Sequence, residues 1–200
     1  MVMKYDPASH HRRSIRLAGY DYSSPGLYFI TICTHERTQL FGEIVNGESV
    51  LSAPGRMVDS WWRRLSEKFP GVLIQEFVIM PNHMHALLAL TNFPDAGKPG
   101  NATAPLQKVQ PPALGRVLQW YKTVTTRAYF RGVHSAGWPP VHQTLWQRNY
   151  YEHVVRTPRA TSRITTYILE NPGRWQADAE NPGATLRAPD PILEILSDDR

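Results

Sequence analysis

Hydrophobic and polar positions alternate in several short stretches of the chain. The segment "LYFITICTHER" (27–37) places β-branched and aromatic residues at alternating positions, which predicts a strand. Two further strands are predicted at "VLIQEFVIM" (72–80) and "HMHALLAL" (83–90), joined through the turn-forming pair Pro81-Asn82. Between the first and second strands, "LFGEIVNGESVLS" (40–52) predicts a hairpin that turns at Asn46-Gly47.

Three other segments have the spacing of amphipathic helices. They are "GRMVDSWWRRLSEKFPG" (55–71), "LGRVLQWYKTVTTRAYFRG" (114–132, closed by its glycine) and "PRATSRITTYILENPGRW" (158–175, stopped at Asn171-Pro172-Gly173). A fourth strand is predicted within "WQRNYYEHVVR" (146–156). The order of strand, helix, strand, strand, helix, strand predicts an α+β, ferredoxin-like fold: an antiparallel sheet with helices on one face, followed by a last helix.

The organisation along the chain suggests one core with less regular additions. We expect a basic N-terminal arm at 1–27, a single core at 28–175 and a loosely attached tail at 176–200. Within the core, residues 91–113 are rich in Pro and Gly and have no periodicity, which predicts a long insertion.

The composition of the chain indicates which partner and which location to expect. The net charge of +5 and the pI of about 9.5 favour a polyanionic partner, and nucleic acid more than membrane. No apolar run approaches the ~20 residues that cross a bilayer, so we expect no membrane span. The single cysteine, Cys33, excludes an internal disulfide framework, and the N-terminus is not a secretory signal, so the expected location is the cytoplasm.

Two histidines in the third predicted strand are the first candidates for chemistry. Alternate side chains of a strand share one face, so His83 and His85 project together while Met84 points to the core. Paired imidazoles are ligands for a divalent ion, but a pair on a solvated sheet face gives the same pattern. No Cys-x-x-Cys or His-Glu-x-x-His motif is present, so the common structural zinc site and metalloprotease helix are excluded.

The last predicted helix carries a second pair of candidates. Tyr167 and Asn171 are four residues apart and therefore lie on one helical face. The amide oxygen of Asn171 could bind a metal with Tyr167 one turn away. From spacing alone, a core tyrosine and a helix-ending asparagine are the favoured explanation of the pair.

Three blocks, in order along the chain, resemble one known family. "PNHMHALL", "LWQRNYYEHVVR" and "YILENPGRW" are similar to the histidine strand, the Trp-Gln block with its acidic-His-x-x-Arg segment, and the tyrosine helix of the HUH-type single-tyrosine transposases. The resemblance is to the IS200-like group, in its branch of REP-associated tyrosine transposases, and runs from about Arg12 to Trp175.

The resemblance implies a fold, a reaction and roles for individual residues. It implies a ferredoxin-like sheet with a C-terminal helix carrying the catalytic Tyr167, and a Mg or Mn ion held by His83, His85 and Asn171. The implied reaction cleaves and rejoins single-stranded, hairpin-forming DNA through a 5′-phosphotyrosine. Members of this family act as monomers or as homodimers. Arg12, Arg13 and Arg16 would belong to its DNA-contacting N-terminus.

Other DNA contacts are suggested by basic residues interleaved with aromatic ones, a pattern typical of surfaces that bind single strands. Each of them could also belong to the core or to a solvated charged face. The candidates are Arg37, Lys122, Arg127, Trp146, Arg148, Tyr150, Tyr151, His153 and Arg156.

Two other functions remain open from the sequence. One is a domesticated DNA-binding protein of the same fold that no longer cleaves. The other is a metal-dependent hydrolase of small substrates, which would lack an acidic third ligand close to the histidine pair in sequence. Covalent, metal-dependent trapping of DNA on the protein separates the transposase from both.

Overall fold

The fold is centred on four strands, which pair in the order β4-β5-β1-β8. They are formed by Val72–Ile79, His83–Leu90, Gly26–Cys33 and Tyr151–Val155, and every pairing between them is antiparallel. We describe this chain from a computed structural model that covers residues 20–94, 108–109, 111–142, 144–185 and 191–199. The strand order is that of a ferredoxin-like sheet, which confirms the predicted α+β class.

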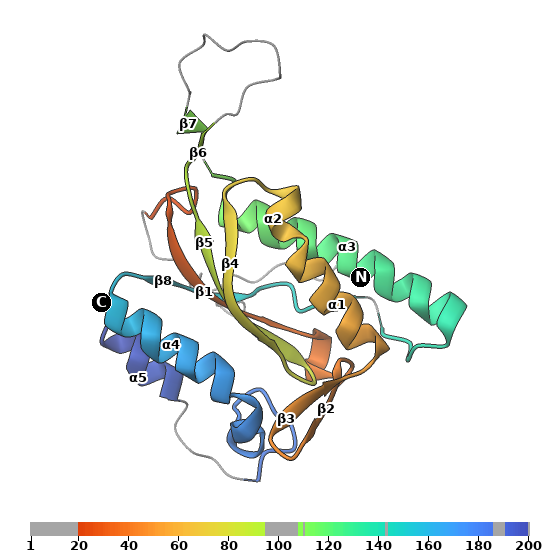
Figure 1. Ribbon diagram of the computed structural model, residues 1–200. Coiled ribbons are helices and arrows are strands. Elements are labelled where there is room, and N and C mark those ends of the chain that lie inside the picture. Colours follow the sequence, from red (N-terminus) through yellow and green to blue (C-terminus); the bar gives the residue numbers. More distant parts are fainter. Residues whose placement is uncertain (1–19, 95–107, 110, 143, 186–190, 200) are drawn as a thin grey trace, which may run out of the picture.

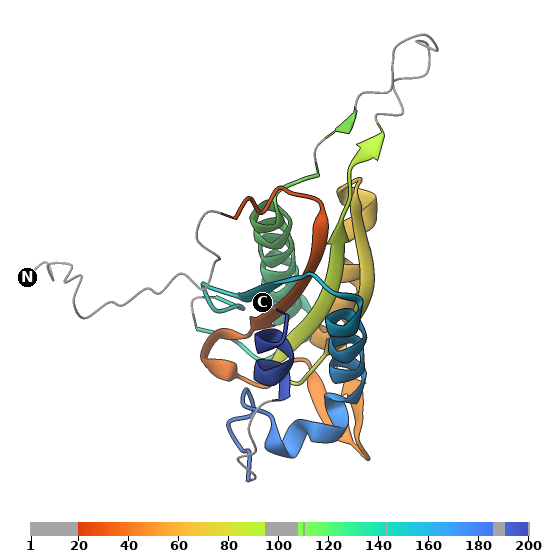
Figure 2. The ribbon, with the colours of Figure 1, turned by 90° about the vertical axis from the view of Figure 1, so that its left-hand side faces the viewer.

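Helices cover both faces of the sheet (Figures 1 and 2). On one face α1 (Ala53–Arg63) and α3 (Leu114–Ala136) enclose the main core, and α2 (Leu65–Lys68) follows α1 directly. On the other face α4 (Pro158–Glu170) and α5 (Pro191–Ser197) pack over a second, smaller cluster of buried residues. The side chains of alternate residues in β1 and β5 therefore enter two different cores, and Tyr167 belongs to the second.

Short-range signals in the sequence explain where the helices begin. The hydroxyl of Ser52 accepts a hydrogen bond from Gly55 N at the start of α1, and the hydroxyl of Thr157 accepts one from Ala160 N at the start of α4. Each helix has a proline in its first turn, where a missing N–H costs nothing.

The third helix is longer than its sequence predicts. Gly132 does not close α3, because the helix continues to Ala136 and ends at Gly137, whose φ is +66°. Gly132 instead allows a close approach: a Cβ at this position would lie 2.2 Å from the ring of Trp138. Gly132 therefore permits close packing against Trp138 and does not end the helix.

The remaining elements are short. The predicted hairpin is confirmed as β2 (Gly42–Val45) and β3 (Glu48–Leu51), with Asn46 at φ 51° and Gly47 at φ 80° in the turn. A 3₁₀ turn, η1 (His35–Arg37), follows β1, and β6 (Phe93–Pro94) pairs with β7 (Lys108–Val109). Most of the predicted insertion, residues 95–107 and 110, lies outside the described residues.

The expectation of a loosely attached tail is wrong for the described part of residues 176–200. The 3₁₀ segment η2 (Pro172–Ala177) turns the chain after α4, and Ile192, Ile195 and Leu196 of α5 are buried in the second core. Asp199 is 3% exposed and accepts hydrogen bonds from the backbone N–H groups of Arg156 and Thr157. The sequence of this segment is rich in turn-forming residues, which hid its short apolar helix.

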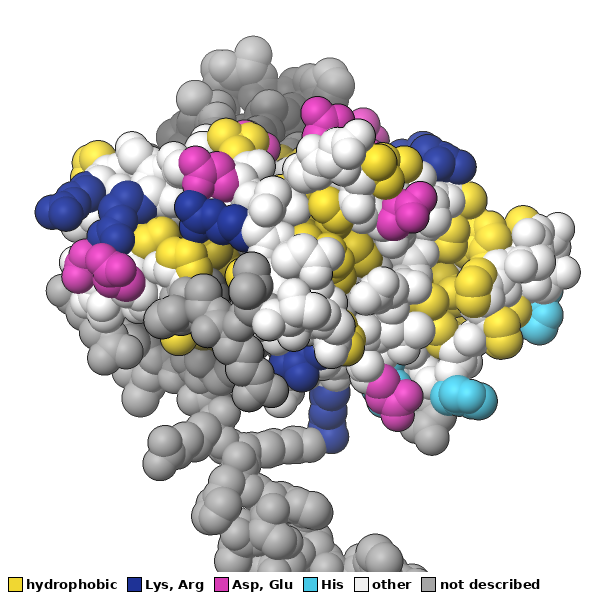
Figure 3. All heavy atoms as spheres, turned by 90° about the horizontal axis from the view of Figure 1, so that it is seen from below, with side chains coloured by type: hydrophobic (Ala, Val, Ile, Leu, Met, Phe, Trp, Pro, Cys, Tyr) yellow, Lys and Arg dark blue, Asp and Glu magenta, His cyan; other side chains and the backbone are white. Residues whose placement is uncertain are grey.

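None of the described helices combines the length and the apolar character that a membrane span needs. Figure 3 shows the lower end of the molecule, where hydrophobic side chains are interrupted by acidic and basic ones.

Candidate metal and tyrosine site

The two histidines lie at the beginning of β5 and face α4. His83 pairs with Cys33 and His85 with Thr31 of β1, while Met84 between them is buried in the main core. The predicted alternation is therefore confirmed. His83 is fully buried and His85 is 4% exposed, so the alternative of a solvated sheet face is excluded. Their Nε2 atoms are 3.1 Å apart, close enough to contact a single ion.

Asn82 fixes the orientation and the tautomer of His83. Its side-chain nitrogen donates to two carbonyl oxygens, Arg37 O at 3.1 Å and Glu180 O at 2.6 Å. The other amide atom, Oδ1, therefore faces His83 Nδ1 at 2.8 Å, and an amide oxygen can only accept. His83 Nδ1 must carry the proton, which leaves a lone pair on Nε2 directed towards His85.

Thr31 performs the corresponding task for His85. Its hydroxyl lies 2.7 Å from His85 Nδ1 on the neighbouring strand. A hydroxyl can donate or accept, so it supports His85 whether or not Nε2 is engaged by an ion. Both histidines are thus held through Nδ1 with Nε2 directed into the site, as is usual for metal-binding imidazoles.

Burial sets the charge state of the pair. Removal from water lowers the pKa of His83 well below its ordinary value, and the positive charges of a protonated His85 and of Arg37 add to this effect. Burial lowers the pKa of His85 to about 3. Both imidazoles are therefore neutral near pH 7, the form that binds metals.

α4 brings Tyr167 to the same place. The Tyr167 hydroxyl lies 3.4 Å from His85 Nε2, and its ring packs edge-on against His85 and Phe29. Asn171, at the end of this helix, is 2% exposed, and its Oδ1 has no hydrogen-bond partner among the described residues. A buried amide oxygen without a partner is costly, and a bound cation would relieve that cost.

A residue that the sequence did not indicate completes the cluster. Asp178 Oδ2 lies 3.7 Å from His83 Nε2, and the ligand atoms of His83, His85 and Asp178 are all within 4.8 Å of one another. Asp178 follows the turn of η2, in the segment expected to be loose. An acidic residue seven positions after Asn171 was the only signal, and spacing alone could not show that the chain returns to the sheet.

The donor set fits a divalent ion. Two neutral imidazoles and one carboxylate converge in the described part of the chain, and a buried amide oxygen on α4 needs a partner. Two imidazoles and a carboxylate that leave further positions open form a donor set of the kind that holds divalent ions in catalytic sites, unlike the closed tetrahedral set of a structural zinc site.

The structure separates the predicted DNA contacts into two groups. Four of them line one groove between the outer face of α3 and the segment 144–150, namely Lys122, Arg127, Arg148 and Tyr150. Trp146 also borders this groove, but it is 1% exposed and packs on Phe41, so its ring cannot stack on a base. For Trp146 the alternative of a core residue is correct.

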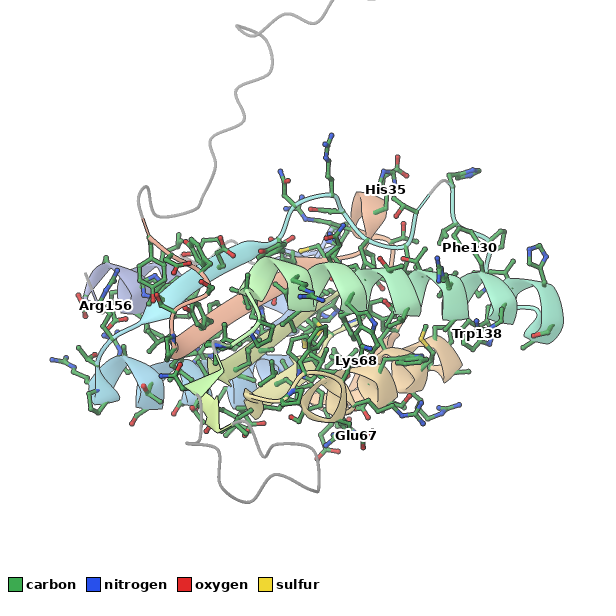
Figure 4. The ribbon with its side chains drawn as sticks, turned by 90° about the horizontal axis from the view of Figure 1, so that it is seen from above. His35, Glu67, Lys68, Phe130, Trp138 and Arg156 are labelled. Atoms are coloured by element: carbon green, nitrogen blue, oxygen red, sulfur yellow. The ribbon has the colours of Figure 1, made fainter. Side chains whose placement is uncertain are left out.

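The other predicted contacts lie elsewhere. His153 Nε2 contacts Asp199 at 3.0 Å, and Arg37 is paired with Glu180 at 2.6 Å. Tyr151 packs against Phe29 in the second core. Figure 4 shows Arg156 at the opposite end of the molecule from Trp138, and it belongs neither to the groove nor to the histidine pair. Arg12, Arg13 and Arg16 are outside the described residues.

Comparison with known proteins gave one close relative. The chain is 39% identical over 183 residues to an uncharacterized protein of Haemophilus influenzae, and the match spans 89% of this chain and 97% of that protein. No family model matches the chain.

Two solved structures are similar in backbone. One is a REP-associated tyrosine transposase bound to a REP hairpin (18% identity, 74% of this chain and 67% of that chain, TM-score 0.48). The other is a Deinococcus radiodurans R1 protein provisionally described as a transposase (17% identity, 78% of this chain and 96% of that chain, TM-score 0.41).

Proposed function

The chain belongs to the same family as the Haemophilus influenzae protein, and we propose that it is a metal-dependent transposase that cleaves and rejoins single-stranded DNA. The observation that carries the proposal is the contact between a tyrosine hydroxyl and a buried, oriented histidine pair. Tyr167 lies 3.4 Å from His85 Nε2, beside a cluster in which Asp178 adds a carboxylate. The resemblance of the three sequence blocks to single-tyrosine transposases is consistent with this geometry.

The roles of the residues follow from their positions. His83 and His85 would hold a Mg or Mn ion through Nε2, with Asn171, Asp178 or both as further ligands. When bound, such an ion polarises the scissile phosphodiester and offsets the charge that develops on its oxygens. Asn82 keeps His83 in the required tautomer, and Asn82 and Thr31 hold the two imidazole rings in their orientations.

Tyr167 would act as the nucleophile. A phenol is weakly nucleophilic at neutral pH, so its attack needs a polarised phosphate. The phenolic oxygen bonds to phosphorus, the bond from phosphorus to the 3′ oxygen breaks, and the phenolic proton ends on the released 3′-hydroxyl. A 3′-hydroxyl can later reverse the reaction and rejoin DNA without ATP, because the phosphodiester energy is kept in the phosphotyrosine.

DNA can react at this site only if one of its phosphates reaches the buried hydroxyl of Tyr167. Tyr167 is 5% exposed, and Trp175 and Asp178 of the segment after α4 lie against His83. A DNA phosphate can reach the hydroxyl only if this segment shifts. A single strand, whose phosphates are not shielded by a partner strand, suits such a confined site better than a duplex.

The proposal is tested by covalent trapping. The native protein is incubated with single-stranded hairpin DNA from beside its own gene, with Mn²⁺, Mg²⁺ or EDTA, and run on a denaturing gel. We expect a metal-dependent adduct that disappears in Tyr167→Phe and persists in the matched variant Tyr151→Phe, which alters a neighbouring tyrosine of the same core. Tight hairpin binding without any adduct would contradict the proposal and favour a DNA-binding protein that does not cleave.

A further inference from the structure

A groove of about 550 Å³ lies away from the histidine pair, beside the other core of the protein. One wall is the outer face of α3, and the other is the segment 144–150 that leads into β8. The groove is of the size that protein sites for nucleotide-sized ligands have. Its lining is formed by Gly115, Gln119, Lys122, Thr123, Thr126, Arg127, Thr144, Trp146, Arg148 and Tyr150.

The charged side chains that line the groove are basic. The lining contains three basic side chains, Lys122, Arg127 and Arg148, and none of the described residues that line the groove is acidic. The hydroxyl and amide groups around them can donate hydrogen bonds to phosphate oxygens. A site with this content favours an anion, and the aromatic ring of Tyr150 at its edge favours an anion that carries a base.

Lys122 is positioned by the opposite wall of the groove. Its ammonium donates hydrogen bonds to Gln147 O and to Arg148 O at 2.9 Å, so two backbone carbonyls hold it and one N–H remains for a ligand. Burial lowers the pKa of Lys122 to about 8, and a phosphate beside it would keep it charged. Arg127 and Arg148 are exposed and able to follow a ligand.

The length of the groove indicates what kind of anion it takes. Lining residues of α3 run from Gly115 to Arg127 on one helical face, a rise of about 18 Å at ~1.5 Å per residue. A free phosphate or a small acid would contact only one end of such a row. A chain of nucleotides would contact all of it.

The groove is connected to the candidate site through the end of β1. The segment that holds Lys122 is itself bound to this strand, because Gln147 N donates to Cys33 O at 2.9 Å. Cys33 is the partner of His83 on the next strand. The groove and the histidine pair are therefore both linked by backbone contacts to the same end of β1.

From these observations we propose that the groove between α3 and residues 144–150 binds the backbone of single-stranded DNA next to the cleaved position, with a base against Tyr150. This inference rests on the proposed function for its choice of DNA. The groove would hold the substrate, while the histidine pair and Tyr167 react with it.

The test measures binding, in EDTA, so that cleavage does not enter. A fluorescent single-stranded oligonucleotide is titrated at several salt concentrations with the native protein, with the groove variant Arg127→Gln/Arg148→Gln and with a control. The control, Arg116→Gln/Arg131→Gln, removes the same charge from exposed residues of α3 that do not line the groove.

Each lost phosphate contact on a single strand reduces the slope of log affinity against log salt by about 0.7. The groove variant loses two basic side chains, so we expect its slope to be smaller by about 1.4 and its affinity to fall on the order of tenfold. The control should stay close to the native protein. As a readout independent of charge, an oligonucleotide containing 5-iododeoxyuridine should crosslink to Tyr150 under light.

Two results would overturn the proposal: equal losses of affinity in both variants, or no measurable binding of single strands by the native protein. The result is also separable from the trapping experiment. If trapping fails while the two variants differ as expected, the groove remains a DNA site and only the cleavage reaction is refuted.

Discussion

Thr31→Val is the most direct test of how the site is organised. Thr31 lies on β1 opposite His85, is 8% exposed, and places its hydroxyl 2.7 Å from His85 Nδ1. Valine replaces this hydroxyl by a methyl group of similar size and keeps the β-branch that suits a strand. The change therefore removes one hydrogen bond to a buried ring nitrogen and leaves the packing nearly intact.

The expected magnitudes follow from that one contact. Loss of the hydrogen bond, together with a buried nitrogen left unpaired, should lower the free energy of unfolding by about 1–3 kcal/mol. Residues that orient a metal-binding histidine typically contribute ten- to hundredfold to metal affinity, so the affinity for Mn²⁺ should fall by about this factor. In free energy this is about 1.4–2.7 kcal/mol.

Two assays separate these effects. Urea unfolding in EDTA measures stability without metal, and calorimetric titration of the folded protein with Mn²⁺ measures affinity. Thr31→Ser restores the hydroxyl and should recover most of the affinity for Mn²⁺. If Thr31→Val is destabilised but binds Mn²⁺ within twofold of the native protein, Thr31 does not orient a metal ligand and its proposed role is refuted.

Three further changes test other parts of the structure. Asp178→Ala should weaken Mn²⁺ binding more than tenfold in the same titration; unchanged affinity would leave Asn171 as the third ligand. Burial raises the pKa of Asp199, but hydrogen bonds to its carboxylate outweigh this and the pKa is lowered overall. The carboxylate thus stabilises the fold above about pH 4, its ordinary range, and this contribution disappears as the pH falls through the lowered value. Asp199→Asn should therefore reduce the free energy of unfolding by about 2 kcal/mol at pH 7. The difference in free energy of unfolding between the variant and the native protein should become smaller below about pH 4, and a difference independent of pH would refute the role of the charge. Gly55→Ala should destabilise by about 1–3 kcal/mol in urea unfolding despite the helix preference of alanine, because the new Cβ would lie 2.0 Å from Phe41 O. Gly173→Ala, where a Cβ meets nothing within 4 Å, is its neutral control.

The sequence predicted those parts of the site that depend on a regular repeat. Strand alternation placed His83 and His85 on one face, and helical spacing placed Tyr167 and Asn171 on one side of α4. The order of elements predicted the antiparallel sheet. Each of these inferences concerns residues within one element or in neighbouring elements. Their relative positions follow directly from the spacing of residues in the sequence.

Irregular segments could not be placed in the same way. Trp146 has the composition of a DNA-contacting residue, yet it lies in the core because the 144–150 segment turns inward to form a bridge with Thr34. Asp178 lies in a segment without periodicity, and its position depends on where η2 directs the chain. A single tryptophan or aspartate in such a segment fits the surface and the interior equally well until the tertiary structure is known.

The segment after α4 also determines how His83, the first of the proposed ligands, is oriented. The tautomer of His83 depends on Asn82, and Asn82 is fixed by two carbonyls, one of which belongs to Glu180. Glu180 is held in turn by its ion pair with Arg37, in the 3₁₀ turn η1 that follows β1. The same short segment thus supplies the carboxylate of Asp178 to the cluster and orients the histidine that this carboxylate faces. Since Glu180 contacts residues 98 and 143 positions before it, the site can form only after β1, β5 and the tail have come together. The metal affinity that we propose for this site would therefore depend on the docking of this segment as well as on the ligands themselves.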